Sequence, residues 1–281
     1  MIGEGGATRA VRVMRRRGDE SRSARDLLAV EEPLEIRVSW TDAAGRKHTE
    51  PLAVTMRTPG DDFDLVAGFL HGEGVLSGVS DLVEMTYCRG AEAQEYNVVE
   101  ARLAPGVALD VERLRRNFYT TSSCGVCGRA SLDAVQAQGC RILTDGLRMD
   151  ARLLPELPDR LRAEQAVFER TGGLHAAGLF DADGGASIVR EDVGRHNAVD
   201  KVIGRAFLDR ALPAVDLVLV VSGRASFELV QKAVMAGVPM LVAVGAPSSL
   251  AVDLARRFHQ TLVGFARDGG SNVYCGEERV R

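Results

Sequence analysis

The sequence lacks the features that would place it in several large classes of protein. It has five cysteines, of which only Cys124 and Cys127 form a close pair, so it does not show the spacing of a secreted disulfide framework. No apolar run approaches the ~18 residues of a membrane-spanning helix. A chain of 281 residues buries roughly three-quarters of its unfolded surface, so its core needs neither disulfides nor a metal. We therefore expect a cytoplasmic protein without a membrane segment.

An excess of charge of one sign is also missing. The 35 basic and 39 acidic side chains give a net charge of -4, which does not support bulk attraction to nucleic acid. The first thirty residues are the exception, because they hold little apolar material among Arg12, Arg15, Arg16, Arg17, Arg22 and Arg25. This composition favours a disordered basic tail over residues 1–30. The polar residues after Arg17 also exclude the apolar core of an export signal.

Residues 31–110 have the pattern of a small α+β domain. Two β-rich runs, 33–40 and 52–56, flank a polar turn and predict a hairpin. The turn sequence 57–62 then precedes Phe63, Val66, Ala67 and Leu70, whose spacing predicts one face of a helix. A further strand is predicted within residues 95–103.

Residues 111–281 have a different pattern. Continuous apolar runs at 215–221, 240–244 and 261–265 are typical of strands covered on both faces. Helical patterns at 226–237 and 248–258 separate them, and another lies at 197–207. This β-α-β-α-β alternation predicts an α/β domain with a parallel sheet and right-handed crossovers.

In such a sheet, ligands bind beyond the carboxyl ends of the strands. The loops expected there, 222–226, 245–249 and 266–271, combine small residues, helix N-termini, Arg224 and Arg267, all of which suit an anionic ligand such as a nucleotide. The sequence has neither a P-loop nor a Rossmann glycine fingerprint, so ordinary turns and caps remain an equal interpretation.

The loop around Cys124-Gly-Val-Cys127 is the densest chemical signal. Arg129 and a helix predicted to begin near residue 131 would favour the thiolate. A thiolate can accept a sulfur atom as a persulfide, which a second thiol can protect or resolve. Two alternatives stay open, an inert loop and half of a zinc site. A closed zinc site would need further ligands from separate segments, namely Cys140, His175 and His196. We expect Cys88, Cys140 and Cys275 to be incidental thiols.

A second dense block follows His175, within a predicted strand-turn-strand. Its charged residues exceed what a helix cap needs: Arg190, Glu191, Asp192, Arg195, His196, Asp200 and Lys201. They indicate either a functional site or a solvated helix start with satisfied salt bridges. His175 itself fits a catalytic role and a structural one equally.

Together these blocks closely resemble the FdhD family of formate dehydrogenase accessory sulfurtransferases. The matching segments are RTPGDDFDLVAGFL (57–70), SSCGVCG (122–128), GGLHAAGLF (172–180), REDVGRHNAVDK (190–201), SGRASFE (222–228) and GAPSSLA (245–251). The resemblance implies a cytoplasmic homodimer that takes sulfur from a cysteine desulfurase. It then passes the sulfur to the molybdenum bis-guanine-dinucleotide cofactor before that cofactor enters formate dehydrogenase.

The resemblance also implies roles for particular residues. Cys124 would carry the persulfide, and Cys127 would assist. The predicted cofactor-binding residues are Phe265, Ala266, Arg267, Asp268, Gly269, Gly270, Ser222, Gly223, Arg224 and His175. No resident metal is expected.

The family is related in fold to the cytidine deaminases, so the resemblance implies a deaminase-like three-layer core in residues 111–281. Zinc deaminases use His-x-Glu followed by Pro-Cys-x-x-Cys. Here His175 has no such acid, and the cysteine pair comes before it. Deamination is therefore not expected. The remaining alternatives are a cofactor-binding chaperone with structural cysteines and a zinc hydrolase acting on a nucleoside.

Overall fold

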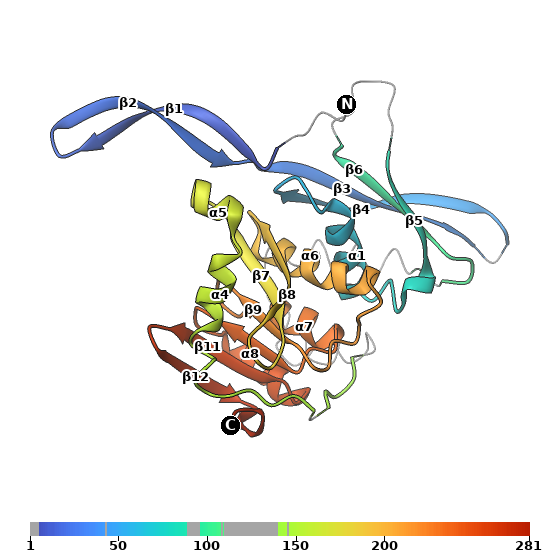
Figure 1. Ribbon diagram of the computed structural model, residues 1–281. Helices are drawn as coiled ribbons and strands as arrows, with labels where there is room; N and C mark the ends of the chain where they lie inside the picture. Colours follow the sequence, from blue (N-terminus) through green and yellow to red (C-terminus); the bar gives the residue numbers. More distant parts are fainter. Residues whose placement is uncertain (1–5, 43, 89–95, 108, 110–139, 145) are drawn as a thin grey trace.

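The structure is a computed structural model that describes residues 6–42, 44–88, 96–107, 109, 140–144 and 146–281. Within these residues the strands form a two-stranded, a four-stranded and a six-stranded sheet. Figure 1 shows the two larger sheets at opposite sides of the body, with helices between them, and the two-stranded hairpin projecting from one corner. None of the described helices is long and apolar enough to cross a membrane.

The four-stranded sheet belongs to the N-terminal part of the chain. Its order is β4-β3-β6-β5, and its strands are β3 (Glu32–Thr41), β4 (Lys47–Arg57), β5 (Leu82–Tyr87) and β6 (Val98–Leu103). The short helix η1 (Val79–Asp81) precedes β5. One face of the sheet carries buried apolar side chains, including Leu34, Ile36 and Val38 of β3, which pack in one core with α1 (Asp62–Gly72). The predicted hairpin and helix are thus confirmed.

The six-stranded sheet has the order β12-β11-β10-β9-β7-β8. Its strands are β7 (His175–Phe180), β8 (Ala186–Asp192), β9 (Val218–Val221), β10 (Met240–Ala243), β11 (Thr261–Arg267) and β12 (Gly270–Cys275). Strands β9, β10 and β11 are parallel, as the apolar runs predicted. The outer strands run antiparallel: β7 pairs with both β9 and β8, and β12 pairs with β11.

Helices cover both faces of this sheet. On one face, α6 (Arg195–Leu208), α7 (Phe227–Met235) and α8 (Ser249–Arg257) share a core with side chains such as Leu219 and Leu241. On the other, α4 (Leu157–Ala163) packs with Phe180, Val218 and their neighbours. Helix α5 (Ala166–Thr171) follows α4, and η2 (Glu277–Arg279) ends the chain. The result is a three-layer α/β arrangement.

Two glycines allow the two parts of the body to meet. A Cβ on Gly68 of α1 would lie 1.9 Å from the carbonyl oxygen of Asp200, and one on Gly204 of α6 would lie 1.8 Å from that of Asp64. The helix backbones therefore touch directly, and only glycine fits at either position.

Buried ion pairs secure the same interface. The Lys201 ammonium lies 2.8 Å from the Asp192 carboxylate, with both side chains almost fully buried, and Lys201 also donates to the carbonyl oxygen of Thr58. Asp192 accepts from the Thr58 amide at 3.1 Å. Arg190 reaches across to Asp64 on α1 at 2.8 Å. Much of the charged block is therefore structural.

The sequence predicts a disordered tail over residues 1–30, but the structure has two strands within this range. Strands β1 (Thr8–Arg17) and β2 (Glu20–Ala29) form an antiparallel hairpin with ten paired positions. Gly18 supplies the left-handed turn residue, with φ of 57°. Low apolar content suggested disorder, but the base of the hairpin is anchored on α5, where Arg170 donates to Oγ1 of Thr8 at 3.4 Å.

Candidate anion-binding site

The carboxyl ends of the parallel strands lie where the alternation predicted. β8, β9 and β10 each run directly into a loop and then into the N-terminus of α6, α7 or α8. Main-chain hydrogen bonds join the two loops that follow β9 and β10: Gly245 donates to the Gly223 carbonyl at 3.0 Å, and Ala225 to that of Ala246 at 3.2 Å. We call this side of the six-stranded sheet the site edge. Its loops are held rigidly together.

Arg224 lies at the centre of the site edge. Its side chain is exposed, and it crowds the next loop so closely that a Cβ on Gly245 would lie 3.0 Å from its Cγ and 3.2 Å from its Cα. Gly245 therefore allows the two loops to approach each other. The guanidinium remains available to an anion from solvent.

Histidine 175 begins β7 and borders the same loop. Its Nδ1 lies 3.5 Å from Oγ of Ser222, which accepts a hydrogen bond from the Ala176 amide at 2.9 Å. Burial, reinforced by the positive charge of Arg195, lowers the pKa of His175 below its ordinary value. The imidazole is consequently neutral at neutral pH and can either donate or accept a hydrogen bond.

The residues of the predicted cofactor-binding segment 265–270 do not all lie at the site edge. The Phe265 amide donates to the Gly245 carbonyl at 3.2 Å, so Phe265 lies against the site edge with its ring partly exposed. Arg267 and the turn after it extend further out, where the guanidinium lies 3.8 Å from Asp268. Ala266 points the other way, into the core shared with α4.

Two residues at the start of α6 belong to the edge but were absent from the predicted cofactor set. Arg195 and His175 both lie close to Gly223. A Cβ on Gly223 would lie 4.0 Å from Cδ of Arg195 and 3.8 Å from Nδ1 of His175. The Nε atom of Arg195 is buried and has no hydrogen-bond partner among the described residues. The signal in the sequence was its position, directly after the end of a strand and at the first turn of a helix.

His196 is the second of these residues. Its Nε2 lies 3.4 Å from Oγ of Ser226 and 3.9 Å from the carboxylate of Glu228, both at the start of α7. The interaction with His196 lowers the pKa of Glu228 to about 2. Arg195 of α6 and Arg224 of the loop after β9 thus lie on one edge, where their guanidinium groups can hold a phosphate.

The cysteine pair Cys124 and Cys127 lies outside the described residues, as does the helix predicted near residue 131. Among the described residues, no group of three or more His, Cys, Asp or Glu side chains could hold a metal ion. The Cys140 sulfur lies 2.9 Å from that of Met235, and burial raises the pKa of this thiol to about 12. That environment disfavours the thiolate a zinc site needs.

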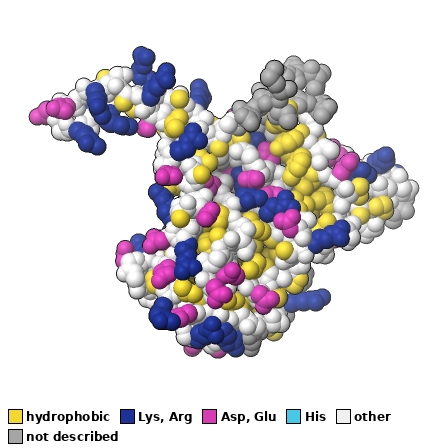
Figure 2. Space-filling view, in the orientation of Figure 1, with side chains coloured by type: hydrophobic (Ala, Val, Ile, Leu, Met, Phe, Trp, Pro, Cys, Tyr) yellow, Lys and Arg dark blue, Asp and Glu magenta, His cyan; other side chains and the backbone are white. Residues whose placement is uncertain are grey.

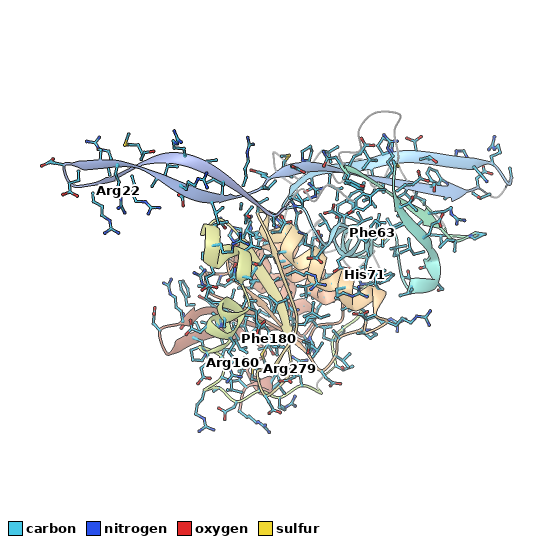
Figure 3. The ribbon with its side chains drawn as sticks, turned by 45° about the horizontal axis from the view of Figure 1, so that its top comes forward. Arg22, Phe63, His71, Arg160, Phe180 and Arg279 are labelled. Atoms are coloured by element: carbon cyan, nitrogen blue, oxygen red, sulfur yellow. The ribbon has the colours of Figure 1, made fainter. Side chains whose placement is uncertain are left out.

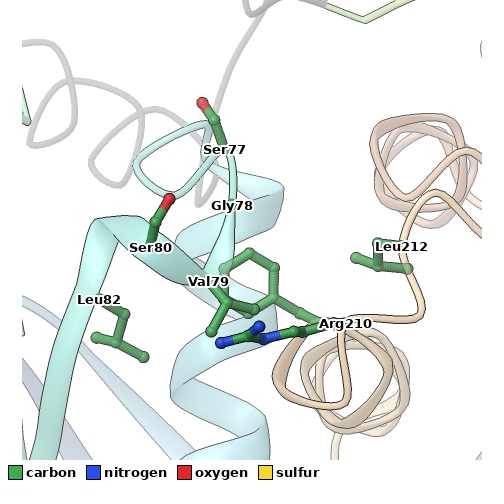
Figure 4. A pocket seen from close by; sticks show the side chains of 8 residues that line it. Ser77, Gly78, Val79, Ser80, Leu82, Arg210 and Leu212 are labelled. Carbon is green, nitrogen blue, oxygen red and sulfur yellow. The ribbon is translucent and has the colours of Figure 1, made fainter.

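A separate pocket of about 520 Å³ lies at the other end of α6 (Figure 4). It is lined by Ser77, Gly78, Val79, Ser80, Leu82, Phe207, Arg210 and Leu212. None of the predicted cofactor-binding residues reaches it.

Fold and site together define an α/β protein with a three-layer core and a cationic, glycine-rich edge suited to an anionic ligand. A family model for the FdhD/NarQ family matches residues 29–281. The chain belongs to this family. It is 55% identical over 281 residues to the sulfur carrier protein FdhD of Streptomyces avermitilis, covering 98% of this chain and 96% of that one. It is 51% identical over 284 residues to the protein of the same name from Mycobacterium tuberculosis, covering 98% and 99%.

The fold also matches that of a candidate formate dehydrogenase accessory protein from Desulfotalea psychrophila, known from its crystal structure. The TM-score is 0.74 at 22% sequence identity, and the match covers 98% of this chain and all of the other. This chain therefore shares its mixed α/β fold with that protein.

Proposed function

We propose that this protein is a sulfur carrier that serves formate dehydrogenase. Cys124 takes a sulfur atom from a cysteine desulfurase, with Cys127 assisting. The Cys124 thiolate attacks the terminal sulfur of the donor's persulfide, so a new sulfur–sulfur bond forms as the donor's bond breaks, and the donor leaves as a thiolate. The carrier then passes the sulfur to the molybdenum bis-guanine-dinucleotide cofactor, its substrate, before that cofactor enters formate dehydrogenase. In this step the Cys127 thiolate attacks the Cys124 sulfur, so a Cys124–Cys127 disulfide forms, the bond to the outer sulfur breaks, and that sulfur leaves at the sulfide level for the cofactor to accept.

The site edge is the observation that carries this proposal. The substrate has phosphate groups, and the edge offers the exposed guanidinium of Arg224, the unsatisfied Nε of Arg195 and helix N-termini. Phe265 offers a partly exposed ring beside them. Membership of the family, and relatives that are named sulfur carriers, support the same assignment.

Three further statements belong to the proposal. The protein acts in the cytoplasm, it works as a homodimer, and its three-layer core is related to that of the cytidine deaminases. The first two rest on the family resemblance. The third rests also on the helix-sheet-helix layering of the six-stranded sheet.

Persulfide mapping tests the chemical step. The protein is incubated with a cysteine desulfurase and cysteine, and its peptides are analysed by mass spectrometry with and without cyanide. We expect cyanide-labile sulfur on Cys124 in the wild type and in the control Cys88→Ser, and its loss in Cys124→Ala. If Cys124→Ala still supports formate dehydrogenase activity in cells, the protein is instead a cofactor-binding chaperone with structural cysteines.

Nucleotide binding tests the site edge separately. Calorimetry with guanosine diphosphate, which supplies the guanine and phosphate groups of the cofactor, should show binding to the wild type. Losing one charge-assisted hydrogen bond costs about 1.5 to 3 kcal/mol, so Arg195→Gln should weaken the affinity roughly 10- to 100-fold. An unchanged affinity would place the nucleotide elsewhere.

A further inference from the structure

The hairpin of β1 and β2, residues 8–29, stands apart from the body of the protein. We call it the β1–β2 arm. Figure 1 shows it projecting beyond the sheets, and Figure 2 shows basic side chains, all of them arginines, along its length. The family model begins at residue 29, so the arm lies before the part of the chain that the model matches.

The arm concentrates positive charge. It holds seven arginines and three acids, a net charge of +4, whereas the whole chain has a net charge of -4, so the remainder of the chain carries a net charge of -8. Arg12 lies directly opposite Arg25, and Arg15 opposite Arg22 (Figure 3 labels Arg22). Like charges in opposed positions destabilise a free hairpin. Among the described residues, one ion pair within the arm offsets them, Arg15 with Asp26 at 3.7 Å.

Both faces of the arm carry the same combination of groups. Arg12 and Arg15 are three positions apart and so lie on opposite faces. Met14 shares a face with Arg12 and is 66% exposed, while Leu28, which is 48% exposed, lies on the other face opposite Arg9, at the base of the arm. An isolated two-stranded hairpin is marginally stable in water. Two cationic faces with exposed apolar side chains fit a protein cleft with acidic walls, which would cover both at once.

A nucleic acid fits these features less well. A duplex that contacts one face of the ribbon leaves the arginine pair and the exposed apolar side chain of the other face uncovered. The acidic remainder of the chain would also repel the phosphate backbone.

The base of the arm connects it to the site edge. Arg170 of α5 donates to Oγ1 of Thr8 at 3.4 Å, and a Cβ on Gly173 would lie 3.5 Å from Cβ of Ala29. Gly173 is two residues before His175. The base of the arm therefore lies beside the site edge, and a partner that covers the arm from its base outward also lies next to that edge.

We propose that the β1–β2 arm docks into an acidic cleft of formate dehydrogenase and holds that enzyme over the site edge, where the cofactor is handed over. The choice of formate dehydrogenase as the partner rests on the proposed function, because the recipient of the cofactor must reach the edge that binds it. The side chains of the arm, two arginine pairs and exposed apolar residues, do not depend on the proposed function.

Surface plasmon resonance with immobilised cofactor-free formate dehydrogenase from the same organism tests the proposal. We expect the full-length wild type to bind, with an affinity that falls as salt rises. Interfacial arginines contribute strongly to binding, so Arg12→Gln/Arg25→Gln and Arg15→Gln/Arg22→Gln should each weaken the affinity about tenfold or more. The matched control, Arg46→Gln/Arg152→Gln, removes the same charge from arginines whose side chains are 75% and 88% exposed elsewhere, and should bind like the wild type.

Several results would overturn the proposal: no wild-type binding at low salt, equal losses in the control, or arm variants that bind like the wild type. A change in sedimentation mass of the arm variants alone would reassign the arm to contacts between copies of this chain. Tighter binding of the wild type to duplex DNA than to the enzyme would reassign it to nucleic acid. Far-UV circular dichroism of each variant checks that the fold is retained.

Persulfide loading separates this proposal from the proposed function. Arm variants should acquire sulfur from the desulfurase at the wild-type level. If the wild type acquires none while the arm variants still lose affinity for formate dehydrogenase, the sulfur-carrier function fails and the docking arm stands.

Discussion

The crossing of α1 and α6 makes a strong prediction about stability. A Cβ on Gly204 would lie 1.8 Å from the carbonyl oxygen of Asp64 and 2.6 Å from the amide nitrogen of Gly68. Both are backbone atoms, so no side-chain rotation can relieve the clash. To reach ordinary contact at 3.4 Å, the helices must separate by about 1.5 Å, and a close-packed interior resists such a shift.

The expected cost of Gly204→Ala follows from two opposing effects. Overpacking costs about 1 to 3 kcal/mol where side chains can adjust and more where they cannot. Alanine returns about 1 kcal/mol through its better helix propensity. Helix separation also strains the pair between Arg190 and Asp64 that spans the interface. We expect a net loss of at least about 2 kcal/mol in the free energy of unfolding, and a fall in Tm of roughly 4 to 8 °C.

Urea unfolding followed by circular dichroism measures this loss. The matched control is Gly78→Ala, where the new Cβ would lie 3.7 Å from Oγ of Ser80, an ordinary contact that needs no adjustment. Its stability should stay within about 1 kcal/mol of the wild type. Gly68→Ala should resemble Gly204→Ala, and the double variant should lose less than the sum, because separated helices accommodate the second methyl. A Gly204→Ala midpoint equal to that of the wild type would refute direct backbone contact.

Two further predictions concern charged groups. Lys201→Met leaves the fully buried Asp192 carboxylate without its cation. We expect the free energy of unfolding, measured in urea, to fall by about 3 to 5 kcal/mol. A loss of less than about 0.5 kcal/mol, as expected of a surface pair, would contradict a structural role. His175 should titrate by NMR below its ordinary pKa of 6.5, and Arg195→Gln should raise that pKa. Because the folded state binds fewer protons at His175, its contribution to stability is present above about pH 6.5 and declines as the pH falls below it. An unchanged His175 titration in Arg195→Gln would show that the two groups do not interact.

Periodicity predicted the elements that surround the site, because it depends on neighbours in the sequence. The apolar runs identified β9, β10 and β11 as parallel strands, and the spacing of Val66 and Leu70 identified α1. From the strand order along the chain, the loop with Arg224 could be placed at the carboxyl edge. Arg195 was visible as one charge among many, and only its position after a strand end set it apart from Arg190, which pairs across the interface.

The sequence by itself determined the α/β class, the position of the anion-suited loops and the resemblance to a sulfurtransferase family, because these depend on short motifs and local periodicity. Tertiary structure alone decided which charges are structural. Asp192 and Lys201 are buried between the two parts of the body, whereas Arg195 and His196, a few residues away, face the site edge. It also decided that the arginine-rich N-terminus is an ordered arm. Pairing between strands and contact between helices join distant segments, and composition does not record such contacts.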